Sequence, residues 1–280
     1  MPAFETPTAI TASVDVVVGD VRIIASERRD TVVEVLPSDP ANDQDVRAAE
    51  RTRVEYADDR LLVRAPKLRS WLPGNHGGSV DVTVELPAES HLRGSGQLAD
   101  FHIDGPLGNC EIAIGLGRMR IDSAATLTLR SGAGDITVEQ VTGHAEITTG
   151  SGEVRVRRHD GSAVIKNSNG DTWVGAAGGH LRVKAANGNV AIDLAQASVV
   201  AKTANGGLRV GEAVRDSVVL ETHVGDVEIG IREGTDAWLD VRAGAGKVRN
   251  ALESVAAPRS SETVEVRART TLGEIVIGRP

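Results

Sequence analysis

Residues 134–214 read GDITVEQVT, GHAEITTGS, GEVRVRRHD, GSAVIKNSN, GDTWVGAAG, GHLRVKAAN, GNVAIDLAQ, ASVVAKTAN and GGLRVGEAV, nine consecutive units of nine residues. Glycine opens eight of the nine units, and apolar residues recur at the third and fifth positions. Thr172, at the third position of its unit, is the main exception. Residues two apart lie on the same face of an extended strand, so each unit predicts a short strand with one buried face.

The outward positions of these units repeat with a longer period of eighteen residues. Two sets of residues recur at this spacing: Asn169, Asn187 and Asn205 before the glycine, and Lys166, Lys184 and Lys202 in the strand. Like residues would stack if alternate units were neighbours, about 4.8 Å apart. This predicts an all-β fold, a right-handed β-solenoid of ~18-residue coils with two strands per coil. We also expect glycine to supply a positive φ at each turn, and the stacked Asn amides to hydrogen-bond between coils.

A long antiparallel β-meander is the alternative fold, because Asn-Gly is also a strong hairpin signal. Such a meander would leave one wholly apolar sheet face uncovered, whereas a solenoid closes on that face. We expect the solenoid domain to span residues 89–280 and to end in an irregular C-terminal coil. Residues 251–262 break the register, and residues 263–280 supply two strands that either close the solenoid or cap it.

Residues 1–88 have a looser pattern and predict a β-rich N-terminal capping segment. Alternating aliphatic residues indicate strands at residues 11–26, 30–37, 61–67 and 79–87, and residues 43–54 predict a short helix. A cap of this kind would cover the open edge of the first coil, which otherwise favours aggregation.

Composition narrows the class of protein. The chain has 280 residues and a formal net charge of −8, which argues against nucleic-acid binding. Its one cysteine, Cys110, excludes an internal disulfide framework and a cysteine-rich zinc site. Cys110 stands at an inward-facing position of its strand, which predicts a small buried apolar side chain. No window approaches 18 uninterrupted apolar residues and residues 1–20 lack a signal-peptide pattern, so we expect no membrane span and a cytoplasmic location. No cofactor is expected.

Two strings, SGAGDITVEQVTGHAEITTGSGEVRV at residues 131–156 and KAANGNVAIDLAQASVVAKTANGGLRV at residues 184–210, resemble the toastrack or putative-adhesin family of bacterial proteins, DUF4097. The stretches at residues 19–39 and 79–96 are similar to actinobacterial members. The resemblance covers nearly the whole chain and implies a β-repeat fold without established catalytic residues. Related domains are often joined to membrane segments in envelope-stress systems, which implies an interaction or sensing role. This sequence shows no such segment.

The repeated lysines predict a basic stripe on one sheet. Its members would be Arg130, Lys166, Arg182, Lys184 and Lys202. Such a stripe could bind an acidic protein, a polyanion or anionic lipid headgroups, and stacked like charges repel modestly when no partner is present. The alternative is that these are ordinary solvated lysines, which also discourage edge-to-edge aggregation.

Three carboxylates, Asp135, Glu153 and Asp171, follow successive turn glycines and suggest a cation such as calcium. At the next two equivalent positions the sequence has Asn189 and Gly207 instead of a carboxylate. Solvated turn carboxylates are therefore the favoured interpretation.

Two histidines and one tryptophan also occupy outward positions. His144 and His180 would lie two coils apart, which is too far for a shared ion and predicts surface residues. Trp173 has an outward phase and could mark a contact surface. No metal site is expected.

These patterns favour a non-catalytic β-repeat scaffold or protein-interaction module, because the outward residues vary and no polar cluster converges. The partner would be another protein or a second copy of the chain. One alternative is a structural protein that self-assembles into filaments through open solenoid ends. Another is a polysaccharide-active β-helix enzyme using Asp135, Glu153 or Asp171, although aromatic residues for sugar platforms make up only 2% of the chain.

Overall fold

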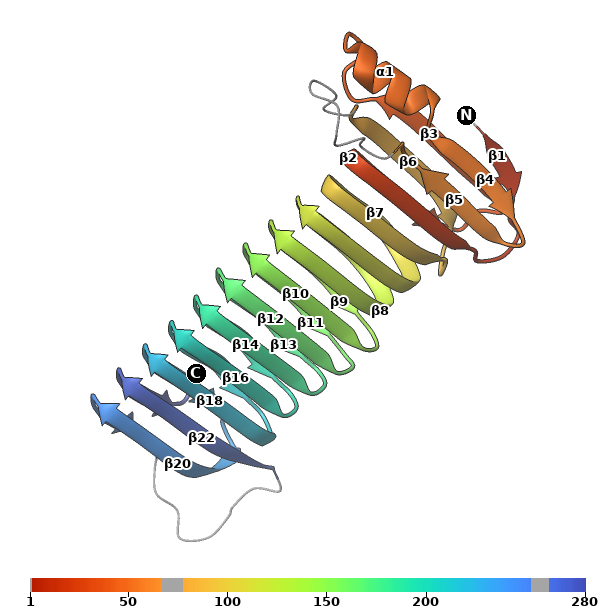
Figure 1. Cartoon of the computed structure of the whole chain (residues 1–280). Coiled ribbons are helices and arrows are strands. Elements are labelled where there is room, and N and C mark those ends of the chain that lie inside the picture. The colour runs from red at the N-terminus through yellow and green to blue at the C-terminus, as the bar shows by residue number, and fades with distance from the viewer. Residues whose placement is uncertain (1, 67–77, 253–261) are drawn as a thin grey trace. The chain divides into compact units, whose positions relative to one another are not determined.

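The computed structural model describes residues 2–66, 78–252 and 262–280, which are mostly β-strands (Figure 1). The chain divides into two compact units, Met1–Gln140 and Val141–Pro280. One helix, α1 (Asp43–Glu50), lies within the range where a helix was expected. Among the described residues, no helix has the length and apolarity needed to cross a bilayer.

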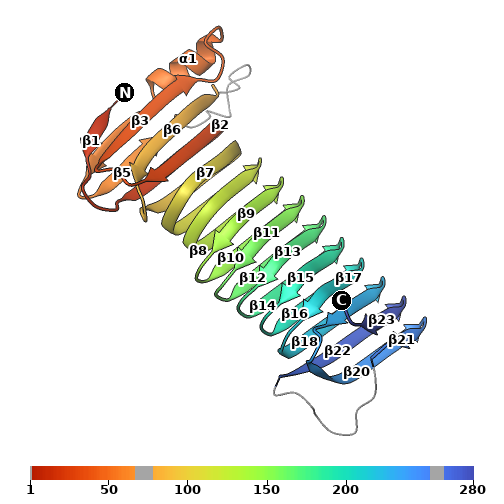
Figure 2. The ribbon, with the colours of Figure 1, turned by 180° about the vertical axis from the view of Figure 1, so that it is seen from behind.

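Strands of the second unit alternate between two parallel sheets (Figures 1 and 2). The first sheet contains, in spatial order, β10 (Ala145–Ser151), β12 (Ala163–Asn169), β14 (Leu181–Asn187), β16 (Val199–Asn205), β18 (Asp216–Val224), β22 (Thr263–Leu272) and β20 (Asp236–Ala245). The second sheet contains β11 (Val154–His159), β13 (Thr172–Ala177), β15 (Val190–Ala195), β17 (Leu208–Ala213), β19 (Val227–Ile231), β23 (Ile275–Gly278) and β21 (Val248–Asn250).

The register confirms the β-solenoid and excludes the antiparallel meander for this unit. Ile165 pairs with Val183 and Val183 pairs with Ala201, so one coil takes eighteen residues. These side chains are buried between the two sheets, as their alternation predicted. The interior is therefore a stack of thin layers made mostly of aliphatic side chains.

Turn glycines differ between the two ends of a coil. Gly188 has φ +137°, and a Cβ built there would lie 2.1 Å from the carbonyl oxygen of Gly170 in the preceding coil. Only glycine fits where two backbones approach this closely with a positive φ. The expectation that every turn needs such a glycine is wrong, because Gly179 lacks a positive φ and Ala197 occupies the equivalent position one coil later.

Polar side chains join neighbouring coils at the corner before these glycines. The amide ladder is confirmed: Asn187 Nδ2 donates to Asn169 Oδ1 at 2.9 Å, and Asn205 Nδ2 donates to Asn187 Oδ1 at 2.9 Å. A second ladder lies inside the corner, where Thr222 Oγ1 donates to the carbonyl of Gly206 at 3.0 Å and Thr270 Oγ1 donates to that of Gly225 at 2.9 Å. These bonds satisfy turn carbonyls that the parallel ladder leaves open.

The first unit continues the same coil geometry. Strand β2 (Thr11–Ser26) bends at Gly19 and supplies both strands of one coil. It pairs in parallel with β5 (Arg60–Arg64) and β6 (Val80–Pro87) on one side, and with β7 (His91–Leu116) on the other. Strands β8 (Met119–Ala133) and β9 (Ile136–Val141) follow β7 in the chain, and β8 pairs with β7 in parallel.

Antiparallel strands cover the outermost coil of the first unit. Strand β3 (Asp30–Pro37) pairs with β6, β4 (Arg53–Ala57) pairs with β5, and β1 (Ala3–Glu5) pairs with β3. Helix α1 contacts β3 and β6. The segment expected as a cap, residues 1–88, thus contains solenoid coils as well as the strands that cover them.

The C-terminal coil lies inside the second unit. Leu220 of β18 pairs with Ala268 of β22, and Val266 of β22 pairs with Leu239 of β20. The last coil of the chain, β22 with β23, is therefore inserted between β18–β19 and the outermost coil, β20–β21. Residues 263–280 thus supply the two strands of a coil, as one of the two expectations had it, but this coil does not close the solenoid, because an earlier segment forms the outermost coil. Residues 253–261 of the expected register break lie outside the described residues.

One buried polar side chain departs from the aliphatic interior. His159 is fully buried in β11 and aligns with Ala177 of the next coil. Its Nδ1 lies 2.8 Å from the carbonyl oxygen of Gly161, while its Nε2 has no hydrogen-bond partner among the described residues. Burial lowers the pKa of His159, which is therefore held neutral.

We expect Gly206→Ala to destabilise the protein and Gly207→Ala to leave its stability almost unchanged. Gly206 has φ +147°, and a Cβ added there would lie 2.0 Å from the Gly188 carbonyl oxygen. A Cβ added at Gly207 would meet nothing closer than 3.4 Å. The first change should lower the free energy of unfolding by on the order of 1–3 kcal/mol, the second by less than about 0.5 kcal/mol. Urea unfolding of both variants tests this, and equal midpoints would contradict it.

We expect the protein to lose stability on acidification partly through His159. The unfolded imidazole takes up a proton near pH 6.5, whereas the buried one does so only at lower pH. Its contribution is therefore present above about pH 6.5 and is lost as the pH falls below it. His159→Leu should flatten the dependence of the unfolding midpoint on pH between 7 and 5. His144→Leu, a change at an exposed histidine, is the control and should keep the wild-type slope.

Candidate functional site

The predicted basic stripe is present as a row on the first sheet of the second unit. Lys166, Lys184 and Lys202 pair in register on β12, β14 and β16. Arg182 lies on the same outward face, two residues before Lys184. Arg130 belongs to β8 of the first unit and is not included in this row. We call Lys166, Arg182, Lys184 and Lys202 the cation cluster.

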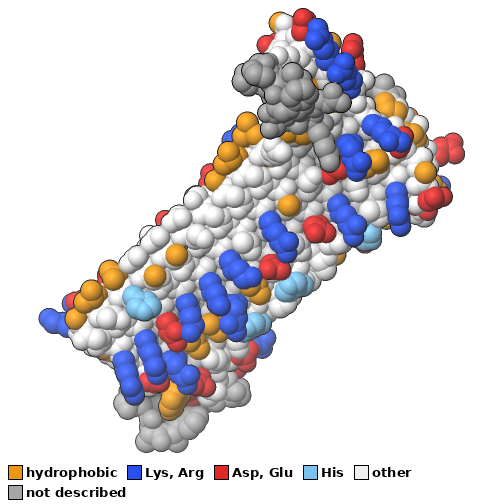
Figure 3. Space-filling model, in the orientation of Figure 1, with side chains coloured by type: hydrophobic (Ala, Val, Ile, Leu, Met, Phe, Trp, Pro, Cys, Tyr) orange, Lys and Arg blue, Asp and Glu red, His pale blue; other side chains and the backbone are white. Residues whose placement is uncertain are grey.

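The cation cluster is neutralised at its edges and not at its centre. Lys166 Nζ lies 3.1 Å from Glu146 Oε1, and Lys202 forms an ion pair with Glu221. No ion pair to Arg182 or Lys184 is found within the part of the chain that the structure describes, and both side chains are exposed. Figure 3 shows that basic side chains on this face alternate in places with acidic ones. The centre of the cluster therefore carries a local positive charge.

The turn carboxylates bind the backbone of the next coil. Asp171 Oδ1 accepts a hydrogen bond from the backbone N–H of Asn189 at 2.8 Å, and Asn189 Oδ1 accepts one from Gly207 at 2.8 Å. Glu153 forms an ion pair with Arg155 at 2.8 Å. Within residues 2–66, 78–252 and 262–280, no group of three or more His, Cys, Asp or Glu side chains could hold a metal ion. Asp171 thus helps to join its coil to the next, whereas Glu153 pairs within its own coil.

The remaining predicted residues are ordinary parts of the fold. His144 and His180 are exposed, and Ser162 stands between them in the stack, with its Oγ 2.8 Å from His144 Nδ1. Trp173 is half-buried, and its Nε1 donates to Asp193 Oδ2 at 3.1 Å, so the ring is held against its own sheet. Cys110 is buried, as predicted, and burial raises the pKa of its thiol to about 12.

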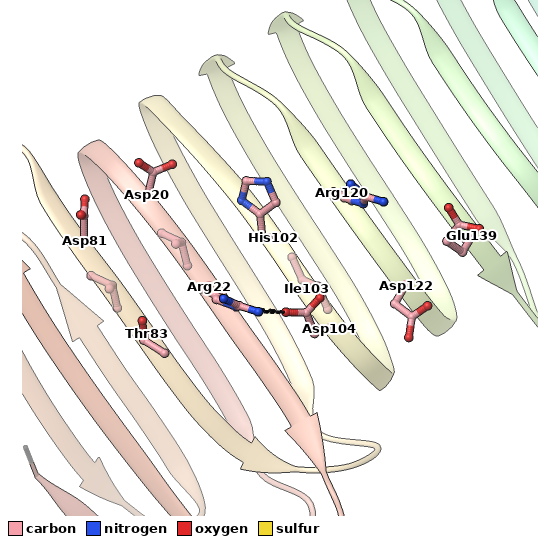
Figure 4. Close-up of a pocket in the computed structure, with 12 residues that line it drawn as sticks. Asp20, Arg22, Asp81, Thr83, His102, Ile103, Asp104, Arg120, Asp122 and Glu139 are labelled. Carbon is pink, nitrogen blue, oxygen red and sulfur yellow. Dashed lines mark hydrogen bonds and ion pairs between the residues drawn. The ribbon is translucent and has the colours of Figure 1, made fainter. Parts of the chain in front are cut away.

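Sequence reasoning missed a shallow groove on the first unit, with a volume of about 690 Å³ (Figure 4). It crosses β6, β2, β7, β8 and β9 on their outward face. Side chains of the same chemical kind form rows across these strands. The first row contains Asp81 and Asp20. The second row contains Thr83, Arg22, His102 and Arg120. The third row contains Asp104 and Asp122. Each strand carries a polar residue at every second position, a signal that could have revealed the groove.

Ion pairs lie within the groove and beside it. Arg22 lies 2.9 Å from Asp104, as Figure 4 shows, and Arg118 lies 2.8 Å from Asp100, which continues the row of Asp81 and Asp20. Burial alone would raise the pKa of Asp100, but hydrogen bonds from the backbone N–H and guanidinium of Arg118 lower it. Burial and the charges of Asp100 and Asp81 raise the pKa of Asp20. The groove thus mixes acidic and basic side chains, whereas the side chains at the centre of the cation cluster are basic.

The chain is similar to several known proteins. The family model described as Toastrack DUF4097 matches residues 11–277. A solved "putative adhesin" from Parabacteroides merdae is 14% identical, with 98% of this chain and 94% of that chain covered and a TM-score of 0.44. One from Parabacteroides distasonis is 15% identical, with coverage of 98% and 95% and a TM-score of 0.40. One from Bacteroides fragilis is 14% identical, with coverage of 99% and 95% and a TM-score of 0.36. Among curated proteins, no significant match is found.

We expect Asp20→Asn to stabilise the protein at pH 7. The pKa of Asp20 is raised, so its charged form is disfavoured in the folded state, and the cost appears as the pH rises through that pKa. The variant should unfold at a higher urea concentration than wild type at pH 7, with the gain disappearing near pH 3. Asp15→Asn on the same strand is the control, because Asp15 is ion-paired with Arg64 at 3.2 Å. That change should lower the midpoint or leave it unchanged, and a rise in both variants would contradict the explanation.

Proposed function

The chain belongs to the Toastrack DUF4097 family, and from this premise we propose that it is a non-catalytic interaction module whose cation cluster contacts an acidic protein surface. The observation that supports the proposal is the unneutralised centre of the cluster. Arg182 and Lys184 share one open face, and the row places Lys166 and Lys202 on either side of Lys184.

The arrangement costs energy in the free protein. Like charges on directly neighbouring strands repel, and the two edge ion pairs are exposed and each stabilise little. An acidic partner would remove this repulsion and would be steered towards the face before contact. The repulsion within the cation cluster is therefore offset only when an acidic partner is bound.

The sheet beneath the cluster suits a protein partner. It is a parallel sheet with its inward residues fully buried, so the cationic side chains stand on a rigid, open surface. Val164 and Val200 flank Arg182 in register and are half-buried, which provides apolar contact beside the charge. Charged and apolar groups together are typical of contacts between proteins.

The test is affinity capture from the native host with three immobilised baits: wild type, Arg182→Glu/Lys184→Glu, and Arg22→Glu/Arg120→Glu as a matched control in the groove. We expect a partner that wild type and the control retain and that the cluster variant loses. Each reversed charge should weaken binding roughly tenfold, about 1.4 kcal/mol, and added salt should weaken it further. Equal capture by all three baits would refute the role of the cluster, and loss only with the control bait would move the contact surface to the groove.

A further inference from the structure

The outermost coil of the second unit has an open edge. Among the described residues, β20 pairs only with β22 and β21 only with β23. In inner coils, inward-facing residues bond to the coil beyond, as when the Leu181 N–H donates to the carbonyl of Ser198. Leu239 occupies the place of Leu181 in this stack. Its N–H, and those of Val241 and Ala243, therefore point towards a place where no described strand lies.

Side chains of the interior are exposed at this edge. Leu239 and Val241 are half-buried, whereas Val266 and Ala268, their neighbours in β22, are fully buried. Val248 of β21, which pairs with the buried Ile275, is 45% exposed. On the outward face of β20, Trp238 is 61% exposed. In the first unit, by contrast, Leu61 and Val84 of the outermost coil are fully buried under antiparallel strands. An uncovered edge with interior side chains is a template for pairing with another strand.

We propose that the open edge of β20 pairs with β20 of a second copy of this chain, antiparallel and centred on Val241. Charge complementarity identifies the occupant. In this register Asp240 of each copy lies opposite Arg242 of the other, twice by symmetry. The side chain of Arg242 is 74% exposed and its Nε lies 3.8 Å from Asp240 Oδ1 in its own chain, so it is available to a second carboxylate.

Hydrogen bonding and shape select the same register. Outward-directed backbone groups sit at alternate residues, so pairing Val241 with its own copy also pairs Leu239 with Ala243. Trp238 then lies opposite Gly244, which leaves room for the indole ring. Centring the contact one residue earlier or later would place Asp240 against Asp240 or Arg242 against Arg242, which is repulsive. The two-fold contact uses the open edges of both copies, so assembly stops at a dimer instead of forming a filament.

The first test is sedimentation equilibrium of the whole protein from low to high micromolar concentration. Wild type should be a reversible dimer, and Arg242→Glu should raise its dissociation constant on the order of a hundredfold, because two like-charge contacts form at once. Arg60→Glu, the same change at an exposed strand residue of the first unit, should leave the dissociation constant unchanged. A wild-type monomer throughout, or equal effects of both substitutions, would overturn the proposal.

The second test fixes the register by mild oxidation of single-cysteine substitutions. Val241→Cys places two thiols opposite each other with Cα atoms ~5.5 Å apart, within disulfide range. In Ala243→Cys the two thiols are offset by four residues, ~14 Å along the strands. We expect a covalent dimer from the first variant and not from the second, while native Cys110 is buried. A dimer from Ala243→Cys alone would refute this register. Neither test involves the cation cluster, so this inference and the proposed function can fail separately.

Discussion

Close backbone approach at one turn of every coil is the constraint on which the rest of the structure depends. At Gly170, Gly188 and Gly206 the backbone of one coil lies so near the carbonyl of the preceding coil that no Cβ fits. Because these glycines recur every eighteen residues, each coil must stack on the last without slipping. Stacking without slip is what brings amide to amide in the asparagine ladder and lysine to lysine in the cation cluster. The surface chemistry of the second unit thus follows from the spacing of its glycines.

The same stacking rule gives two different surfaces. Where one residue type repeats at an outward position, as at Lys166, Lys184 and Lys202, like charges accumulate and can be neutralised only at the ends of the row. In the groove of the first unit, rows of opposite charge lie side by side, so a residue of one row can pair with one of the next, as Arg22 does with Asp104. A row of like charges can therefore be neutralised where a row of opposite charge lies beside it.

The period of the sequence was sufficient to predict the solenoid, its buried positions and both ladders of like residues in the second unit. It did not reveal the order of coils at the ends, because alternating aliphatic residues look the same whichever coil becomes the neighbour. The groove was missed for the same reason: Asp20 and Asp81 lie sixty-one residues apart and meet only because β2 lies beside β6. Asp171 is an exposed turn carboxylate, as expected, but its hydrogen bond from the backbone N–H of Asn189 depends on the stacking of coils and was not predicted.

The inserted terminal coils have a consequence for biosynthesis. A ribosome makes β20–β21 before β22–β23, yet β22–β23 is the layer that lies directly against β18–β19. Domains generally fold as the chain emerges, from the N-terminal side, but here the outermost coil has no native neighbour among the described strands until residues 263–278 have left the exit tunnel. A chain that stalls or is cleaved before residue 263 would therefore lose an interior layer and leave the outer one unsupported.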